Sequence, residues 1–131
     1  MQKDPIFELC DIVRETGFAI HKYLGPGHLE KVYVNALVNR LGKRGLHVQP
    51  RHPCQVYDED GTILGEFFAD LLIEQTLIVE AKAVAGILND HIAQILGYLR
   101  ATRLEHGLLV NFGSRTFAVK KYYCSDAIPG E

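Results

Sequence analysis

Apolar residues recur at helical spacing in the first part of the chain and predict two amphipathic helices. The first pattern covers residues 6–24 and stops at the sequence LGPG of residues 24–27, which combines a helix stop with a turn. The second covers residues 28–44 and stops at Gly45, which suits a left-handed helix cap. Gly27 is expected to serve the turn between the helices, whatever the chain does.

From residue 46 the pattern changes to that of strands, and three strands fit residues 46–84. The acidic, glycine-containing sequence at residues 58–61 predicts a tight turn between the first two. A third helix is expected to be capped by Asn89 or Asp90, and Gly107 is expected to end that region. Two last strands are expected at residues 108–112 and 116–123.

This order of elements predicts an α/β fold in which a central mixed sheet is flanked by helices. A length of 131 residues with 47% hydrophobic content suits one compact domain. We expect the domain to span residues 1–125 and residues 126–131 to form a loose tail. The N-terminus has no basic segment leading into an apolar stretch, and no apolar window is long enough to cross a bilayer. We therefore expect a cytoplasmic protein without membrane contact.

Charge and cysteine content narrow the function classes. A net charge of -2 lacks the strongly basic footprint of a protein that coats nucleic acid non-specifically. The three cysteines are far apart and outside any C-x-x-C pair, so free thiols are expected in place of disulfides or a zinc site. His52 and Cys54 alternate as a soft-metal pair would, but they lack further ligands. The sequence contains no P-loop, Rossmann fingerprint or G-x-S-x-G motif.

Three charged residues interrupt apolar strand segments. Asp70 lies in FFADLLI, and Glu80 and Lys82 lie in IVEAKAV. Burying such groups is costly unless they are paired or bind a metal. Two interpretations stay open: Asp70 forms a buried salt bridge with Lys82 while Glu80 faces solvent, or all three form a site.

Strand alternation sets a condition for the second interpretation. Glu80 and Lys82 are two residues apart and share a face of the sheet, whereas Asp70 joins them only across an odd-length loop or a β-bulge. Two neighbouring carboxylates repel by about 1 kcal/mol in water and about 4 kcal/mol near a protein surface, and a divalent cation reverses that sign. Hard carboxylate oxygens, with the Ala81 carbonyl and waters, suit Mg²⁺ or Mn²⁺ better than Zn²⁺. Lys82 can then orient or help deprotonate a metal-bound water.

Asp70 followed by Glu80-Ala81-Lys82 resembles the D…(D/E)-x-K signature of the PD-(D/E)XK nuclease superfamily. The sequence GHLEKVY at residues 27–33 is similar to the G-x-x-E-x-x-Y motif of the GxxExxY family within it, as are residues 94–102 and 109–113. The resemblance implies a restriction-endonuclease-like core and a Mg²⁺- or Mn²⁺-dependent nuclease acting on DNA or RNA.

The resemblance also implies roles for individual residues. Asp70 and Glu80 match the metal-binding acids, and Lys82 matches the catalytic lysine. Glu30 matches a helical glutamate that joins the metal site and its catalysis. Gln94 matches a glutamine that contacts a phosphate or the attacking water.

Two positions depart from the family pattern. Ala69 stands where the superfamily label has proline, and Ile92 stands where relatives often carry an acid. The second departure removes any role for an acid at that position and leaves Gln94 unaffected.

Supporting roles follow from helical spacing. Tyr33 shares a helix face with Glu30, so its hydroxyl can support that carboxylate, although a core role for Tyr33 stays open. Glu30 can instead be a first-turn acid favoured by the helix dipole. His91 and Tyr98 lie on the same face as Gln94 and can line the site.

A non-catalytic module that retains the fold to bind nucleic acid or protein is the alternative function. The basic group Lys43, Arg44, Arg51 and His52 can contact a phosphate backbone or form a solvated face. A homodimer is a further possibility, because Tyr122 and Tyr123 in the last strand would suit an interface.

Overall fold

The computed structural model describes residues 4–125, so residues 1–3 and the expected tail at 126–131 lie outside the described part. Its elements, in chain order, are α1 (Pro5–Leu24), α2 (Glu30–Lys43), β1 (Val48–Tyr57), β2 (Ile63–Ile73), β3 (Leu77–Lys82), α3 (Asn89–Thr102), β4 (His106–Asn111) and β5 (Ala118–Tyr123). This is the order of elements that the sequence predicts. None of the helices in this part of the chain is long and apolar enough to cross a membrane.

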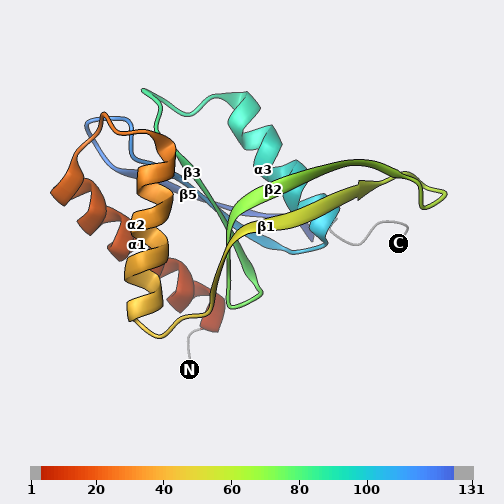
Figure 1. The fold of residues 1–131 in the computed structure, drawn as a ribbon, viewed down its shortest axis with the longest axis horizontal. Helices are drawn as coiled ribbons and strands as arrows, with labels where there is room; N and C mark the ends of the chain where they lie inside the picture. Colours follow the sequence, from red (N-terminus) through yellow and green to blue (C-terminus); the bar gives the residue numbers. More distant parts are fainter. Residues whose placement is uncertain (1–3, 126–131) are drawn as a thin grey trace.

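The five strands form one mixed sheet in the order β1-β2-β3-β4-β5. β3 and β4 are parallel, and the other neighbours are antiparallel. Helices α1 and α2 pack on one face and α3 on the other, which confirms the predicted α/β architecture (Figure 1). Tyr33, Leu37 and Phe112 belong to the first core, and Ile78 and Leu99 to the second.

Helix α2 begins after a turn whose geometry requires glycine. Gly25 and Gly27 have φ angles of 70° and 113°, which confirms the predicted turn role of Gly27. Gly45 has a φ of 86° just beyond the end of α2, as expected for a left-handed cap.

The start of α3 differs from expectation. The N-cap is Leu88, not Asn89 or Asp90, and its backbone N–H donates to Nδ1 of His91 over 2.9 Å. The imidazole therefore satisfies a polar group at this end of the helix, a function that the sequence analysis gave to Asn89 or Asp90.

Gly107 lies inside β4 and does not end the helical region. A Cβ at this position would lie 3.0 Å from Cδ1 of Ile95, so glycine lets α3 pack closely on the sheet. The end of α3 is instead marked by Arg103, whose φ of 61° is left-handed.

Candidate active site

Asp70 and Glu80 come together where β2 and β3 separate. Ile73 pairs with Leu77, so the loop between the strands has three residues, which confirms the predicted odd-length connection. The paired register ends at Leu71 and Val79. Asp70 and Glu80 are the next residues along the two strands.

The ribbon formed by β1 and β2 changes orientation at the same place. Pro50 pairs with Leu71 and His52 with Ala69, which leaves Arg51 and Asp70 opposite each other without pairing. Arg51 has a φ of 51°, a left-handed conformation that few non-glycine residues adopt. Ala69 packs in the core beneath α3, whereas Leu71 packs in the core of α1 and α2. The two faces of the ribbon thus exchange sides at Arg51 and Asp70. Asp70 consequently has no paired residue on either neighbouring strand, β1 or β3.

Hydrogen bonds between side chain and backbone replace the missing ladder. The N–H of Asp70 donates to Oε1 of Glu80 over 3.2 Å, and the N–H of Ala81 donates to Oδ2 of Asp70 over 2.9 Å. Glu80 is only 4% exposed. Within residues 4–125 no ion pair joins Asp70 to Lys82. A buried Asp70–Lys82 salt bridge with Glu80 in solvent is therefore not the arrangement found.

The burial of Glu80 gives this pair its electrostatic character. Desolvation by burial and then the negative charge of Asp70 raise the pKa of Glu80 to about 9. Ionising both groups at neutral pH consequently calls for a nearby positive charge. The two hard carboxylate groups fit a hard divalent cation.

Lys82 and Gln94 extend the pair toward α3. Nζ of Lys82, at the end of β3, donates to Oε1 of Gln94 over 3.0 Å. This contact brings together two residues that the sequence analysis selected twelve positions apart. It places a cation next to the carboxylates without pairing it to Asp70.

Glu30 lies at the start of α2 and is half-buried. Burial raises its pKa, the positive charge of Lys82 opposes that rise, and the charge of Asp70 adds to it. Glu30 therefore interacts electrostatically with the site from the other helical layer. Among the described residues, however, no three Asp, Glu, His or Cys side chains converge tightly enough to enclose a metal. Asp70 and Glu80 form the hydrogen-bonded pair, and Glu30 is linked to them through electrostatic interaction.

Tyr33 takes the core role that the sequence left open. Its hydroxyl donates to the carbonyl of Gly25 over 2.6 Å and accepts from the N–H of His28 over 3.1 Å. Its buried ring stacks on Phe112, with centroids 4.6 Å apart. Both recorded hydrogen bonds go to the turn before Glu30, so Tyr33 supports that turn and not the carboxylate.

His91 and Tyr98 occupy different parts of the site region. The Nδ1 atom of His91 accepts the capping bond from Leu88 at the start of α3. Burial, followed by the charges of Glu80 and Asp70, raises the pKa of Tyr98 to about 12. Its ring stacks on Phe67 at 3.9 Å.

Asn111 is a site-supporting residue that the sequence analysis missed. It is 2% exposed, and its amide both accepts from the N–H of Val84 over 3.1 Å and donates to the Val84 carbonyl over 3.0 Å. These bonds fix the segment that follows Lys82. The available signal was an amide at the end of the apolar strand LLVN, because buried amides need partners.

Comparisons with known proteins bear on the family and the fold of the chain. A sequence model of the PD-(D/E)XK nuclease superfamily matches residues 8–122. No functionally curated protein matches the chain. The crystal structure of SSO0001 is similar in fold, with a TM-score of 0.57 and 19% identity over 71% of this chain and 48% of that one. The chain thus spans about half the length of that structure.

Proposed function

The chain belongs to the PD-(D/E)XK nuclease superfamily, and we propose that it is a divalent-metal-dependent nuclease that hydrolyses phosphodiester bonds in DNA or RNA. The observation that carries the proposal is the Asp70–Glu80 pair at the separation of β2 and β3. The neighbouring Lys82–Gln94 contact supports it. The spacing of Gly27, Glu30 and Tyr33 further supports assignment to the GxxExxY family.

Asp70 and Glu80 would hold Mg²⁺ or Mn²⁺, with waters completing the coordination that these hard cations prefer. A bound metal would lower the pKa of the attacking water and stabilise negative charge on the scissile phosphate. The buried position of Glu80 keeps its carboxylate oriented toward Asp70. The hydrogen bond from Ala81 likewise holds Asp70 in place.

Lys82 and Gln94 act on the reacting groups in this proposal. The Lys82 ammonium stabilises negative charge that develops on the phosphoryl oxygens and orients the attacking water. Gln94 fixes Lys82 through its Oε1 atom and leaves its amide N–H groups to bond a phosphate oxygen. Glu30 adds a second acidic group on the α2 side, where it would bind a water of the metal.

The test is incubation of the protein with labelled single-stranded, double-stranded and branched DNA and RNA in Mg²⁺, Mn²⁺ or EDTA. Metal-dependent cutting that Asp70→Asn and Lys82→Ala each abolish would support the proposal. Lys120→Ala, an exposed lysine on β5, is the matched control and should cut normally. Binding without cutting in any metal would favour the alternative, a non-catalytic binding module.

A further inference from the structure

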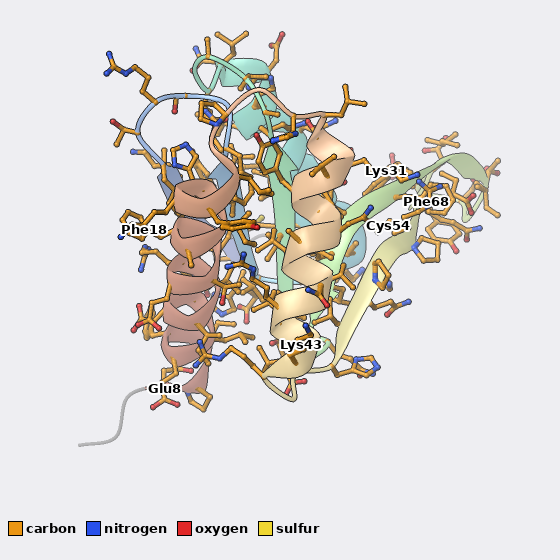
Figure 2. The ribbon with its side chains drawn as sticks, turned by 60° about the vertical axis from the view of Figure 1, so that its left-hand side comes forward. Glu8, Phe18, Lys31, Lys43, Cys54 and Phe68 are labelled. Carbon is orange, nitrogen blue, oxygen red and sulfur yellow. The ribbon has the colours of Figure 1, made fainter. Side chains whose placement is uncertain are left out.

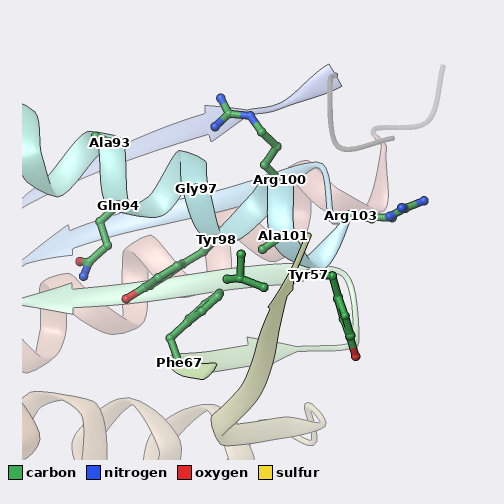
Figure 3. A pocket seen from close by; sticks show the side chains of 10 residues that line it. Tyr57, Phe67, Ala93, Gln94, Gly97, Tyr98, Arg100, Ala101 and Arg103 are labelled. Carbon is green, nitrogen blue, oxygen red and sulfur yellow. The ribbon is translucent and has the colours of Figure 1, made fainter. Parts of the chain in front are cut away.

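A cleft of about 570 Å³ lies between the end of the β1–β2 ribbon and α3. β1 contributes Val56 and Tyr57, and β2 contributes Phe67. Tyr98 and Gln94 face the same cleft from α3 (Figure 3). The volume is in the range of protein sites that hold a small organic group such as a nucleotide.

The cleft is continuous with the candidate active site through one side chain. Gln94 lines the cleft, and its Oε1 atom accepts the hydrogen bond from Lys82. Tyr98, another cleft residue about one helical turn further along α3, has its pKa raised by burial and then by the charges of Glu80 and Asp70. A polymer that placed a phosphate at Lys82 would therefore extend its neighbouring units into the cleft.

The lining of the cleft is suited to flat apolar groups. Val56 and Tyr57, on β1, are 38% and 56% exposed. Phe67 and Tyr98 also line the cleft and stack on each other with ring centroids 3.9 Å apart. Aromatic side chains that line a groove bind nucleobases by stacking with little sequence preference.

Two arginines give the rim a positive charge. Arg100 and Arg103 are exposed, and the residues that line the cleft include no acid. Figure 3 shows both side chains extending outward from the α3 end of the cleft.

We propose that this cleft binds unpaired bases of a single-stranded nucleic acid, with Arg100 and Arg103 contacting its phosphates. The assignment rests on the proposed nuclease function and specifies its substrate class. In a duplex the base faces are stacked and paired, so they cannot reach the aromatic lining of the cleft. A single-stranded segment presents those faces and keeps its phosphates free for the rim.

Position 57 offers a direct reporter, because the chain has no tryptophan and Tyr57 can be replaced by one. Tyr57→Trp gives a single emission signal in the cleft, and Tyr23→Trp gives a matched signal at the 79%-exposed Tyr23 on α1. Oligothymidylate and oligouridylate of about 12 nucleotides are titrated in EDTA, so that binding is measured without cleavage. We expect both to quench Tyr57→Trp and leave Tyr23→Trp unchanged. An abasic strand of equal length should not quench.

Charge removal gives the second measurement. The double variant Arg100→Ala, Arg103→Ala should bind the single strand about tenfold more weakly by fluorescence polarisation, with a reduced salt dependence. The control double variant Arg14→Ala, Lys22→Ala, which removes two exposed cations from α1 on the other side of the sheet, should bind as the parent does. Equal quenching by a duplex, or equal loss in both double variants, would overturn the assignment.

These outcomes separate the cleft from the nuclease function. Asp70-dependent cutting without quenching of Tyr57→Trp would refute the cleft assignment and leave the nuclease function standing. Base-dependent quenching without cutting in any metal would support the cleft and refute the nuclease function. Quenching of Tyr57→Trp by oligouridylate and not by oligothymidylate would support the cleft with RNA as its ligand.

Discussion

The backbone N–H of Asp70 donates a hydrogen bond to Oε1 of Glu80 over 3.2 Å. This bond lies where β2 has left the ladders on both of its sides, so the two carboxylates are held by each other's strands. Glu80 is buried at this junction, and its pKa is raised by desolvation and by Asp70. Either a proton on Glu80 or a metal bound between the two carboxylates would therefore relieve the repulsion between Asp70 and Glu80.

Metal binding should depend on both acids. Titration with Mn²⁺, followed by electron paramagnetic resonance, should detect a site in the parent protein that Asp70→Asn and Glu80→Gln each weaken strongly. At a metal concentration of about 100 times Kd the parent should gain about 2.7 kcal/mol of stability. Glu66→Gln, which changes an exposed acid on β2, is the control and should retain that gain. Unchanged Mn²⁺ binding in Asp70→Asn would exclude the proposed ligand pair.

Stability in EDTA should fall as pH rises. Between the ordinary glutamate pKa of 4.5 and the folded value of about 9, the folded protein keeps a proton on Glu80 that the unfolded chain has lost. Rising pH therefore favours unfolding by up to about 1.4 kcal/mol per pH unit, and the penalty is complete above the folded pKa. Glu80→Gln should lack this component. Urea unfolding at several pH values, with Glu66→Gln as the reference, measures the difference in slope.

Lys82 should separate catalysis from metal binding. Lys82→Ala should lower the cleavage rate about 100- to 1000-fold, because it removes a positive charge from the developing phosphoryl anion. Mn²⁺ binding should persist, since the ammonium repels the metal. Gln94→Ala should produce a smaller loss in the same direction, because it releases Lys82 without removing its charge. A wild-type rate for Lys82→Ala would contradict the catalytic role.

Substitution of Glu30 can distinguish a role in the active site from a role as a first-turn acid that stabilises helix α2. Glu30→Gln should lower cleavage activity and leave the free energy of unfolding nearly unchanged, because burial already opposes ionisation of this group. Glu8→Gln removes a first-turn acid from α1 and is the matched control. A helix-dipole role predicts a different result. Both variants would then lose about 0.3–1 kcal/mol of unfolding free energy, and Glu30→Gln would cleave as fast as Glu8→Gln.

The local patterns predicted the elements of the fold and the relation of three site residues. Alternation along β3 determines that Glu80 and Lys82 share a face, and the odd loop needed for Asp70 is present between Ile73 and Leu77. Helical spacing likewise placed Gln94 on the face of α3 that carries His91 and Tyr98, and the exposed Gln94 side chain meets Lys82. These relations depend on periods of a few residues, which a sequence records directly.

Relations between distant segments were not predictable in this way. The reversal of the ribbon at Arg51 depends on a positive φ in a residue type that gives no sign of it. The Tyr33 hydroxyl bonds Gly25 and not Glu30, because backbone groups of the turn compete for it. The cleft arises from residues on β1 and α3 that lie about forty positions apart.

Single-turnover cleavage of a labelled single strand in Mn²⁺ tests the central claim most directly. The parent and Glu66→Gln should cut, EDTA should stop both, and Asp70→Asn should be slower by about 1000-fold. Asparagine keeps an oxygen to accept from Ala81, so this variant retains the local hydrogen bond and loses the charge. Equal cleavage by Asp70→Asn and the parent would contradict the assignment of Asp70 and Glu80 as the metal-binding pair of a nuclease.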